Sequence, residues 1–176
     1  MKENKFTKYI LVVLILVIIA GILTFANFKG GRKIEKGVVP GTPRLVAVAD
    51  DVFGQFEGNN YSQVETIDID GTSYRLDCSG YVNAVLNEAG IINSKDENVS
   101  VDFVNEYAVP GYTKYKFDAN SIDGPAIVAK EGNIAIVNRT ADDTFVYYCF
   151  GSSSATKRYL SSAELNAEGF TVMYMK

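Results

Sequence analysis

The residues from Tyr9 to Phe28 form a run of 20 residues that contains no charged side chain and is strongly apolar. A helix rises about 1.5 Å per residue, so a run of this length can cross a bilayer core roughly 30 Å thick. Residues 9–28 are therefore predicted to be a transmembrane signal-anchor.

A cleavable signal peptide is the alternative to an anchor. Its apolar region normally has about 7–15 residues, which is shorter than this run, and no small-x-small cleavage site follows it here. No cysteine stands at the end of the run, which excludes a bacterial lipoprotein anchor. Basic residues lie on both sides, so charge alone does not set the orientation. The short tail of residues 1–8 favours an orientation with the C-terminal part outside the cytoplasm.

The rest of the chain divides into a linker and one domain. Residues 29–43 are basic and rich in glycine and proline, which is typical of an extended juxtamembrane linker. Residues 44–176 are numerous enough to bury one hydrophobic core. Residues 37–176 hold 10 Lys and Arg against 19 Asp and Glu, a formal balance of −9, so nucleic acid is not an expected partner. The seven basic residues among the first 36 are expected to meet anionic lipid head groups.

Apolar periodicity predicts helices first and strands afterwards. Residues at three- and four-residue spacing predict helices over Arg44–Phe56 and Tyr81–Ala89, and a short helix over Ser100–Tyr107. Strands are predicted where Val, Ile, Tyr and Phe gather, at Ala126–Ala129, Ile134–Asn138, Thr144–Phe150 and Thr171–Tyr174. Ser161 and Glu164 have the spacing of a capping box, which predicts one more short helix. This order is that of an α+β fold with an antiparallel sheet.

Cys78 stands where the second predicted helix begins. Asp77 can cap that helix, and the unpaired backbone N–H groups of a helix N-terminus favour a thiolate. Ser79 and Gly80 complete an Asp-Cys-Ser-Gly run. The chain contains no histidine, however, so the usual base beside a nucleophilic thiol is missing. A buried, inert cysteine is the alternative explanation.

The stretch from Gly71 to Ile91, GTSYRLDCSGYVNAVLNEAGI, resembles the NlpC-type cell-wall cysteine peptidases, which have a papain-like fold. In that family an Asp-Cys-Ser-Gly-aromatic run opens the first core helix, and the cysteine attacks peptide bonds in peptidoglycan stem peptides. The resemblance implies that Cys78 is the nucleophile position, with Asp77, Ser79 and Gly80 beside the cleft. It also implies that the domain is papain-like, with N-terminal helices packed on an antiparallel sheet.

Segments on both sides of this motif carry weaker likenesses. Val46–Tyr61 resembles the leading helix of the family, and Tyr61 would then be the tyrosine near the cleft. Glu131–Ile136 resembles the family's entry into the sheet, with Asn133 where an aspartate is usual.

The strand that normally begins with the catalytic histidine resembles Thr144–Gly151. The resemblance leaves Phe145, or Thr144 after a shift of one residue, at the vacant histidine position. The family's third polar residue would fall near Thr156 or Lys157, and neither is the usual type.

Other side chains near the vacant position are poor substitutes for imidazole. Asp142 and Asp143 have carboxylates near pKa 4, roughly 4.5 units or about 6 kcal/mol below a thiol near 8.5. Tyr147 and Tyr148 are conceivable proton donors, although alternate faces of a half-buried strand explain both residues more simply.

Cys149 leaves two possibilities open. Two cysteines outside the cytoplasm can form a disulfide, which would remove Cys78 from catalysis. If Phe145 takes the histidine position, however, Cys149 lies roughly 13 Å further along the strand, and both thiols stay reduced unless the register shifts.

These observations lead to an expected function and to two alternatives. We expect a membrane-anchored, extracytoplasmic NlpC-like domain that has lost its base and binds peptidoglycan stem peptides or an envelope protein. One alternative is an active cysteine peptidase or amidase with a non-histidine base or a base supplied by a partner. The other is a structural ectodomain of a larger envelope assembly. No cofactor and no metal site are expected, because the sequence has no Cys–His cluster, phosphate loop or calcium-loop spacing.

Overall fold

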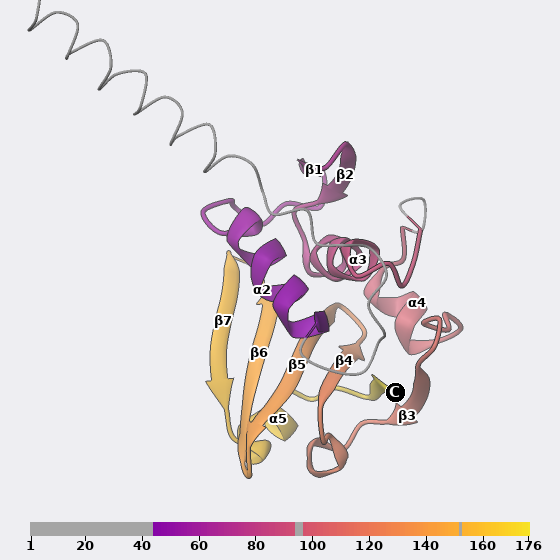
Figure 1. Cartoon of the computed structure of the whole chain (residues 1–176), viewed down its shortest axis with the longest axis vertical. Coiled ribbons are helices and arrows are strands. Elements are labelled where there is room, and N and C mark those ends of the chain that lie inside the picture. Colours follow the sequence, from indigo (N-terminus) through magenta and orange to yellow (C-terminus); the bar gives the residue numbers. More distant parts are fainter. Residues whose placement is uncertain (1–43, 94–96, 152) are drawn as a thin grey trace, which may run out of the picture. The chain divides into compact units, whose positions relative to one another are not determined.

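The structure is a computed structural model, and it describes residues 44–93, 97–151 and 153–176. The predicted tail, membrane anchor and linker, residues 1–8, 9–28 and 29–43, lie outside the described residues. Among the residues that are described, none of the helices has the length and apolar character needed to cross a membrane. The described part is an α+β fold, in which helices pack on an antiparallel sheet (Figure 1).

Six strands form the main sheet, in the order β3-β8-β4-β5-β6-β7, and every neighbouring pair is antiparallel. Their bounds are β3 Thr113–Lys116, β4 Pro125–Lys130, β5 Asn133–Ala141, β6 Thr144–Phe150, β7 Ala155–Leu160 and β8 Val172–Met175. The central strands β4 and β6 are buried almost throughout, whereas β5 is buried at residues 134–137 and exposed at its C-terminal end. The two edge strands, β3 and β7, are mostly exposed.

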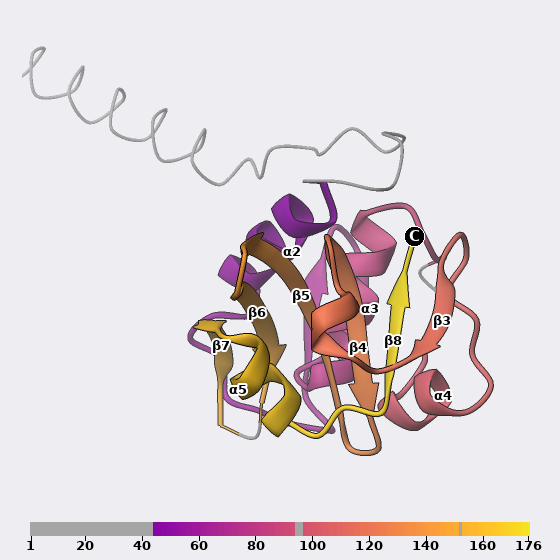
Figure 2. The same cartoon turned by 90° about the horizontal axis from the view of Figure 1, so that it is seen from below.

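Helices cover the two faces of this sheet. Helices α2 (Arg44–Phe56), α3 (Cys78–Glu88) and α4 (Ser100–Val104) precede it in the chain, and α5 (Ser162–Ala167) lies between β7 and β8. A 3₁₀ turn, η1, spans Ala119–Ser121 and contacts α5. Figure 2 shows α2 and α3 on one side of β5 and β6, and α5 beside β6 and β7.

Side-chain alternation along β6 shows which face each helix covers. Tyr148 and Phe150 point toward α2: the Tyr148 hydroxyl donates to Asp50 at 3.2 Å, and the Phe150 ring lies 5.3 Å from that of Phe56. Successive strand residues point to opposite faces, so Tyr147 and Cys149 face the side of α5. Of the site residues discussed below, Tyr147 and Cys149 come from this second face, whereas Cys78 of α3 and Phe150 come from the first.

Helix α3 is the centre of the core. Ten of its eleven residues are buried, whereas α2 buries only one stripe. The Tyr81 hydroxyl donates to the Ala49 carbonyl of α2 at 2.8 Å, and its ring meets Phe56 edge to face at 5.5 Å. These contacts hold α2 and α3 together on the sheet.

A hairpin precedes α3 that the sequence analysis did not predict. Strands β1 (Thr66–Ile69) and β2 (Thr72–Arg75) pair around Asp70 and Gly71, whose φ angles are 48° and 81°. Two consecutive positive φ angles are what a tight two-residue hairpin turn requires, and Asp-Gly is a favoured pair for it. Thr72 and Ser73, which follow this turn, belong to β2.

The other predicted elements are largely confirmed. The helix over Arg44–Phe56 is α2, and the helix predicted over Tyr81–Ala89 is α3, which begins three residues earlier. All four predicted strands are present as β4, β5, β6 and β8. The capping box is also present, since Ser161 accepts from the Glu164 N–H and the Glu164 side chain accepts from the Ser161 N–H. The predicted helix over Ser100–Tyr107 is shorter and ends at Val104.

Candidate functional site

Asp77 caps α3, as the sequence predicted. Its Oδ1 accepts from the Gly80 N–H at 2.7 Å, and its Oδ2 lies 3.7 Å from the Arg75 Nε. The Asp77 side chain is buried, so this cap is shielded from water. The cap fixes the first turn of α3 and thereby the position of the next residue, Cys78.

Gly80 is required by packing. A Cβ placed on Gly80 would lie 2.0 Å from the Arg75 carbonyl oxygen and 2.8 Å from its carbon. The end of β2 therefore passes directly against the first turn of α3. Glycine at this position permits the close approach that brings Asp77 onto the helix N-terminus.

Cys78 is the first residue of α3, and only 5% of its surface is exposed. Burial raises the pKa of the Cys78 thiol, because it disfavours the charged thiolate, and the negative charge of Asp77 raises it further. Hydrogen bonds from the Ile134 backbone and from Ser79 act in the opposite direction. The net shift is upward, so the thiol is neutral near pH 7 and the expected activation by the helix end does not prevail.

Cys78 opens into a cavity of about 460 Å³ that residues of α3, four strands (β4, β5, β6 and β7) and the end of α5 line. Its lining consists of neutral residues and three charged ones. The neutral residues are Tyr61, Cys78, Gly132, Asn133, Tyr147, Cys149, Phe150, Gly151, Ser153 and Thr156. The charged residues are Lys130, Arg158 and Glu168. We refer to this cavity as the thiol pocket.

Both cysteines of the chain lie in the thiol pocket, and both are free. The Cys149 sulfur is 3.3 Å from the Asn133 Oδ1 and 3.6 Å from the Ile134 carbonyl oxygen. Burial raises the pKa of Cys149 to about 12. Of the two possibilities left open by the sequence, the structure therefore has the pair of reduced thiols, and Cys149 lies much nearer to Cys78 than expected.

Asn133 and Tyr147 are polar side chains that contact Cys149. Tyr147 hydrogen-bonds with Cys149 and with Asn133, and burial raises its pKa far above the ordinary value. Asn133 is the first residue of β5 and follows the tight turn at Gly132. An amide cannot take up a proton near neutral pH, so Asn133 can position a ligand but cannot act as a base.

Phe145 and Thr144, the expected vacant histidine position, do not line the thiol pocket. Strands β5 and β6 are antiparallel, and Phe145 pairs with Arg139 near the far end of β5. The Phe145 ring is fully buried under the Arg139 guanidinium, 4.7 Å away. The end of β6 that reaches Cys78 is its C-terminal end. Asn133, at the start of β5, therefore lies closer to the thiol than either predicted residue.

The candidate substitute groups are also dispersed. Asp142 and Asp143 lie in the turn between β5 and β6, where Asp143 accepts from the Ser162 N–H at 2.9 Å. Tyr148 faces α2, as does Lys157, which pairs with Asp50. Thr156 does line the pocket, because it pairs with Cys149 across β6 and β7.

Tyr61 lies in the thiol pocket, at the place that the sequence resemblance implied. Its ring stacks on Phe150, with centroids 6.0 Å apart and an interplanar angle of 26°. Burial raises the pKa of Tyr61, so its hydroxyl stays protonated and available for hydrogen bonding. Ser79 and Gly80 are buried inside the first turn of α3 and shape the helix end rather than the pocket surface.

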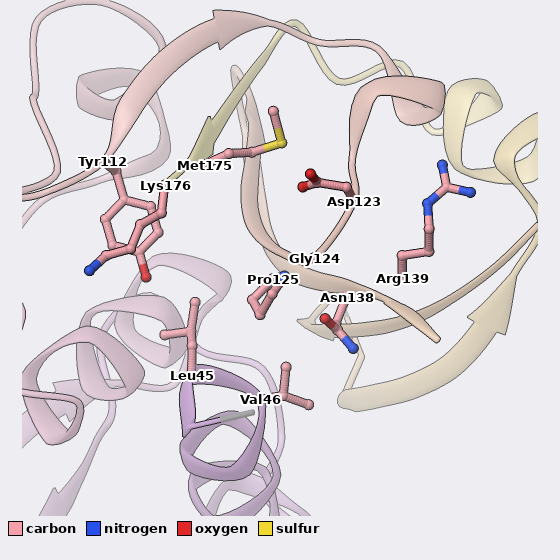
Figure 3. Close-up of a pocket in the computed structure, with 10 residues that line it drawn as sticks. All are labelled: Leu45, Val46, Tyr112, Asp123, Gly124, Pro125, Asn138, Arg139, Met175 and Lys176. Carbon is pink, nitrogen blue, oxygen red and sulfur yellow. The ribbon is translucent and has the colours of Figure 1, made fainter. Parts of the chain in front are cut away.

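A second cavity, of about 550 Å³, lies away from Cys78 (Figure 3). Leu45 and Val46 of α2 form one side, and Asp123, Pro125 and Asn138 lie across from them. Arg139 borders this cavity, but its guanidinium donates to four backbone carbonyls of η1 and nearby loops. Asp123 and Lys176 are the other charged residues in its lining, and neither cysteine of the chain lies there.

Comparisons of the chain with models of known families, with curated proteins and with solved structures found no match in any of the three. The NlpC resemblance of the cysteine motif therefore stays a prediction. Within the described part of the chain, no group of three or more His, Cys, Asp and Glu side chains is placed to hold a metal ion.

The three charged residues of the thiol pocket, which come from three different elements, were not predicted. Lys130, Arg158 and Glu168 carry no motif, and only the strand order and register bring them together. Asn133 had a usable signal, since it directly follows the Glu-Gly turn at the entry of a predicted strand.

Proposed function

We propose that this chain is a membrane-anchored, extracytoplasmic NlpC-like domain with a papain-like fold, and that it binds peptides without cleaving them. Its ligands are peptidoglycan stem peptides or a segment of an envelope protein. The membrane location is inferred from residues 9–28, and the family from the motif around Cys78. The observation that carries the binding function is a pocket with a buried thiol and no group suited to accept its proton.

Peptide hydrolysis by a thiol needs a thiolate and then a proton for the leaving amine. Burial raises the pKa of Cys78, and it also raises the pKa values of the other titratable neutral groups in the pocket, Tyr61, Tyr147 and Cys149. Glu168 forms an ion pair with Arg158. Among the described residues that line the pocket there is no imidazole, and the thiols and phenols have raised pKa values, so hydrolysis is expected to stall.

Binding makes a different demand, because recognition and bond cleavage depend on different groups. A volume of about 460 Å³ falls in the range of small-ligand sites, which is roughly 300–1,000 Å³. Asn133 and Thr156 supply hydrogen-bonding side chains, and the Tyr61 ring supplies an apolar wall. Glycines at positions 132 and 151 leave backbone accessible to an extended peptide.

One observation favours the alternative of an active peptidase. The Ile134 backbone and Ser79 form hydrogen bonds with the Cys78 sulfur, and these bonds lower its pKa because they stabilise the thiolate. If a partner supplied an imidazole, or a ligand excluded water from the pocket, these hydrogen bonds would already be in place to stabilise the Cys78 thiolate.

The two functions separate in one experiment on the purified full-length chain. Binding of a synthetic stem tetrapeptide is measured by calorimetry, and its cleavage by mass spectrometry, for the wild type and for Cys78→Ala. We expect equal affinity within about twofold and no cleavage by either protein. Cys149→Ala is the matched control, because it removes the other thiol of the same pocket.

Cleavage by the wild type that disappears in Cys78→Ala and persists in Cys149→Ala would overturn the binding function in favour of the peptidase. Absence of binding by the wild type would overturn the stem-peptide assignment and leave an envelope protein as the partner.

A further inference from the structure

Three charged side chains line the thiol pocket, and Glu168 links the other two. The Glu168 carboxylate pairs with the Arg158 guanidinium, and the Glu168 carbonyl accepts a hydrogen bond from the Lys130 ammonium. Glu168 is the C-cap residue of α5, whereas Lys130 ends β4 and Arg158 lies in β7. Residues from three elements thus converge in the lining of the pocket.

Lys130 has no anionic partner among the described residues. Its ammonium donates to the Glu168 carbonyl and lies 5.7 Å from the Phe170 ring centroid. No carboxylate oxygen of the described residues lies within 4.0 Å of it, the limit that defines the ion pairs found elsewhere in the domain. A half-buried ammonium that contacts only a carbonyl and a ring keeps a full positive charge and two N–H groups for a ligand.

Its neighbours hold the Arg158 side chain in position, but they do not occupy all of its N–H donors. The register pairs it with Tyr147, and its guanidinium lies 4.7 Å above that ring. One of its terminal nitrogens donates to Glu168. Arg158 also hydrogen-bonds with Tyr147, but a guanidinium has five N–H donors in a rigid fork, so these two contacts leave donors for a ligand.

The sign of this charge is opposite to that of the domain. Residues 37–176 have a formal balance of −9, whereas the pocket lining has two cations and one carboxylate, a balance of +1. A positive hollow in a negative domain attracts an anionic group and repels a cationic one. Because Glu168 already neutralises part of the charge, a group with one negative charge matches the pocket better than a dianion such as phosphate.

We propose that Lys130 and Arg158 form a subsite for a carboxylate of the bound peptide, with Glu168 as a built-in competitor that lowers affinity. The subsite lies beside the two thiols, so a carboxylate held there places the adjoining peptide backbone along Tyr147, Cys149 and Asn133. This inference rests on the proposed peptide-binding function and specifies the chemistry of its ligand.

The test compares two probes on the full-length chain: a synthetic stem tetrapeptide with free carboxylates, and the same peptide with all of its carboxylates converted to carboxamides. We expect Lys130→Gln to weaken binding of the free-acid peptide about tenfold and to leave the carboxamide peptide unaffected. Lys130→Arg keeps the charge and should restore binding, which separates loss of charge from loss of folding. Lys116→Gln is the matched control, because it removes one exposed lysine of edge strand β3, outside the pocket.

Glu168→Gln provides a test of opposite sign. Removing the competing carboxylate should strengthen binding of the free-acid peptide about two- to fivefold, since exposed ion pairs have energies of that order. The backbone carbonyl that holds Lys130 stays in place in this variant.

The outcomes separate this inference from the function on which it rests. Equal wild-type affinity for the two peptides, or an equal loss in Lys130→Gln and Lys116→Gln, would overturn the carboxylate subsite and leave peptide binding intact. Displacement of the free-acid peptide by inorganic phosphate at lower concentration than by acetate would also overturn it, in favour of a phosphate site. Binding of neither peptide would overturn the stem-peptide function together with the subsite.

Discussion

Replacing Gly80 by alanine should destabilise the domain strongly, although alanine is the better helix former. The new Cβ would lie 2.0 Å from the Arg75 carbonyl oxygen, about 1 Å inside the shortest contact that a real Cβ makes. The atom in the way is backbone, held by the Asp77 cap and by the β1–β2 hairpin, so it cannot turn aside as a side chain would. The clash must therefore move β2 or α3.

The magnitude follows from two opposing effects. Glycine to alanine inside a helix normally stabilises by about 0.5–1 kcal/mol. Overpacking in a close-packed interior costs about 1–3 kcal/mol, and rigid backbone places this site at the upper end. We expect a net loss of about 2 kcal/mol in the free energy of unfolding.

Urea denaturation followed by circular dichroism would measure this loss, with Gly54→Ala as the control. Gly54 also lies in a helix, α2, but a Cβ there would meet nothing within 4 Å. We expect Gly54→Ala to stabilise the domain by up to about 1 kcal/mol. Unchanged or higher stability in Gly80→Ala would refute the steric argument and would return Gly80 to the list of candidate functional residues.

Two further predictions concern charged side chains. Asp77→Asn should keep the helix cap, with a loss below about 1 kcal/mol in the free energy of unfolding. The same change should lower the pKa of Cys78, because the negative charge of Asp77 raises that pKa. A higher pKa for alkylation of Cys78 in this variant would contradict that reasoning. Hydrogen bonds from Ser121, Ser162 and Ser161 lower the pKa values of the exposed carboxyls Asp118, Asp143 and Glu164 respectively. Their folded-state pKa values lie below the unfolded ones, so the stability that they contribute is present above about pH 4.5 and is lost as the pH falls through the lowered values. In the triple variant Asp118→Asn, Asp143→Asn and Glu164→Gln, the melting temperature should decrease less steeply as the pH falls below about 4.5. An unchanged dependence of the melting temperature on pH would assign acid unfolding to other groups.

The parts of the fold that were predictable are those set by short stretches of sequence. The Asp77 cap and the Ser161–Glu164 capping box depend on residues within one turn, and both were predicted from short sequence patterns. The buried central strands were predictable for a similar reason, since their runs of Val, Ile, Ala and aromatic residues exceed what an exposed segment carries.

The edge strands could not be predicted in the same way. Strands β3 and β7, TKYK and ATKRYL, are charged and exposed, and they become strands only because a buried neighbour offers a backbone ladder. Charged edges of this kind also discourage pairing with other chains.

The candidate site illustrates the same limit. The sequence indicated Cys78 and Tyr61, and the structure places both in the thiol pocket. The sequence resemblance placed Phe145 opposite the thiol. A family pattern gives the position of a residue along a strand, but it does not say which end of that strand lies against the helix. The antiparallel register of β5 and β6 brings Asn133 and Cys149 there instead. Local spacing carries no information on this choice, because it depends on how the whole sheet docks against α3.

The pH dependence of alkylation at Cys78 tests the central claim most directly. The full-length chain would be treated with iodoacetamide from pH 5 to pH 10.5, and modification of each cysteine would be followed by mass spectrometry. Because burial raises the pKa of Cys78, we predict half-maximal reactivity above the ordinary thiol value of about 8.5, with Cys149 reacting only at still higher pH. An apparent pKa well below about 7 would contradict the account, since it would show an activated thiolate and an enzyme rather than a peptide-binding domain.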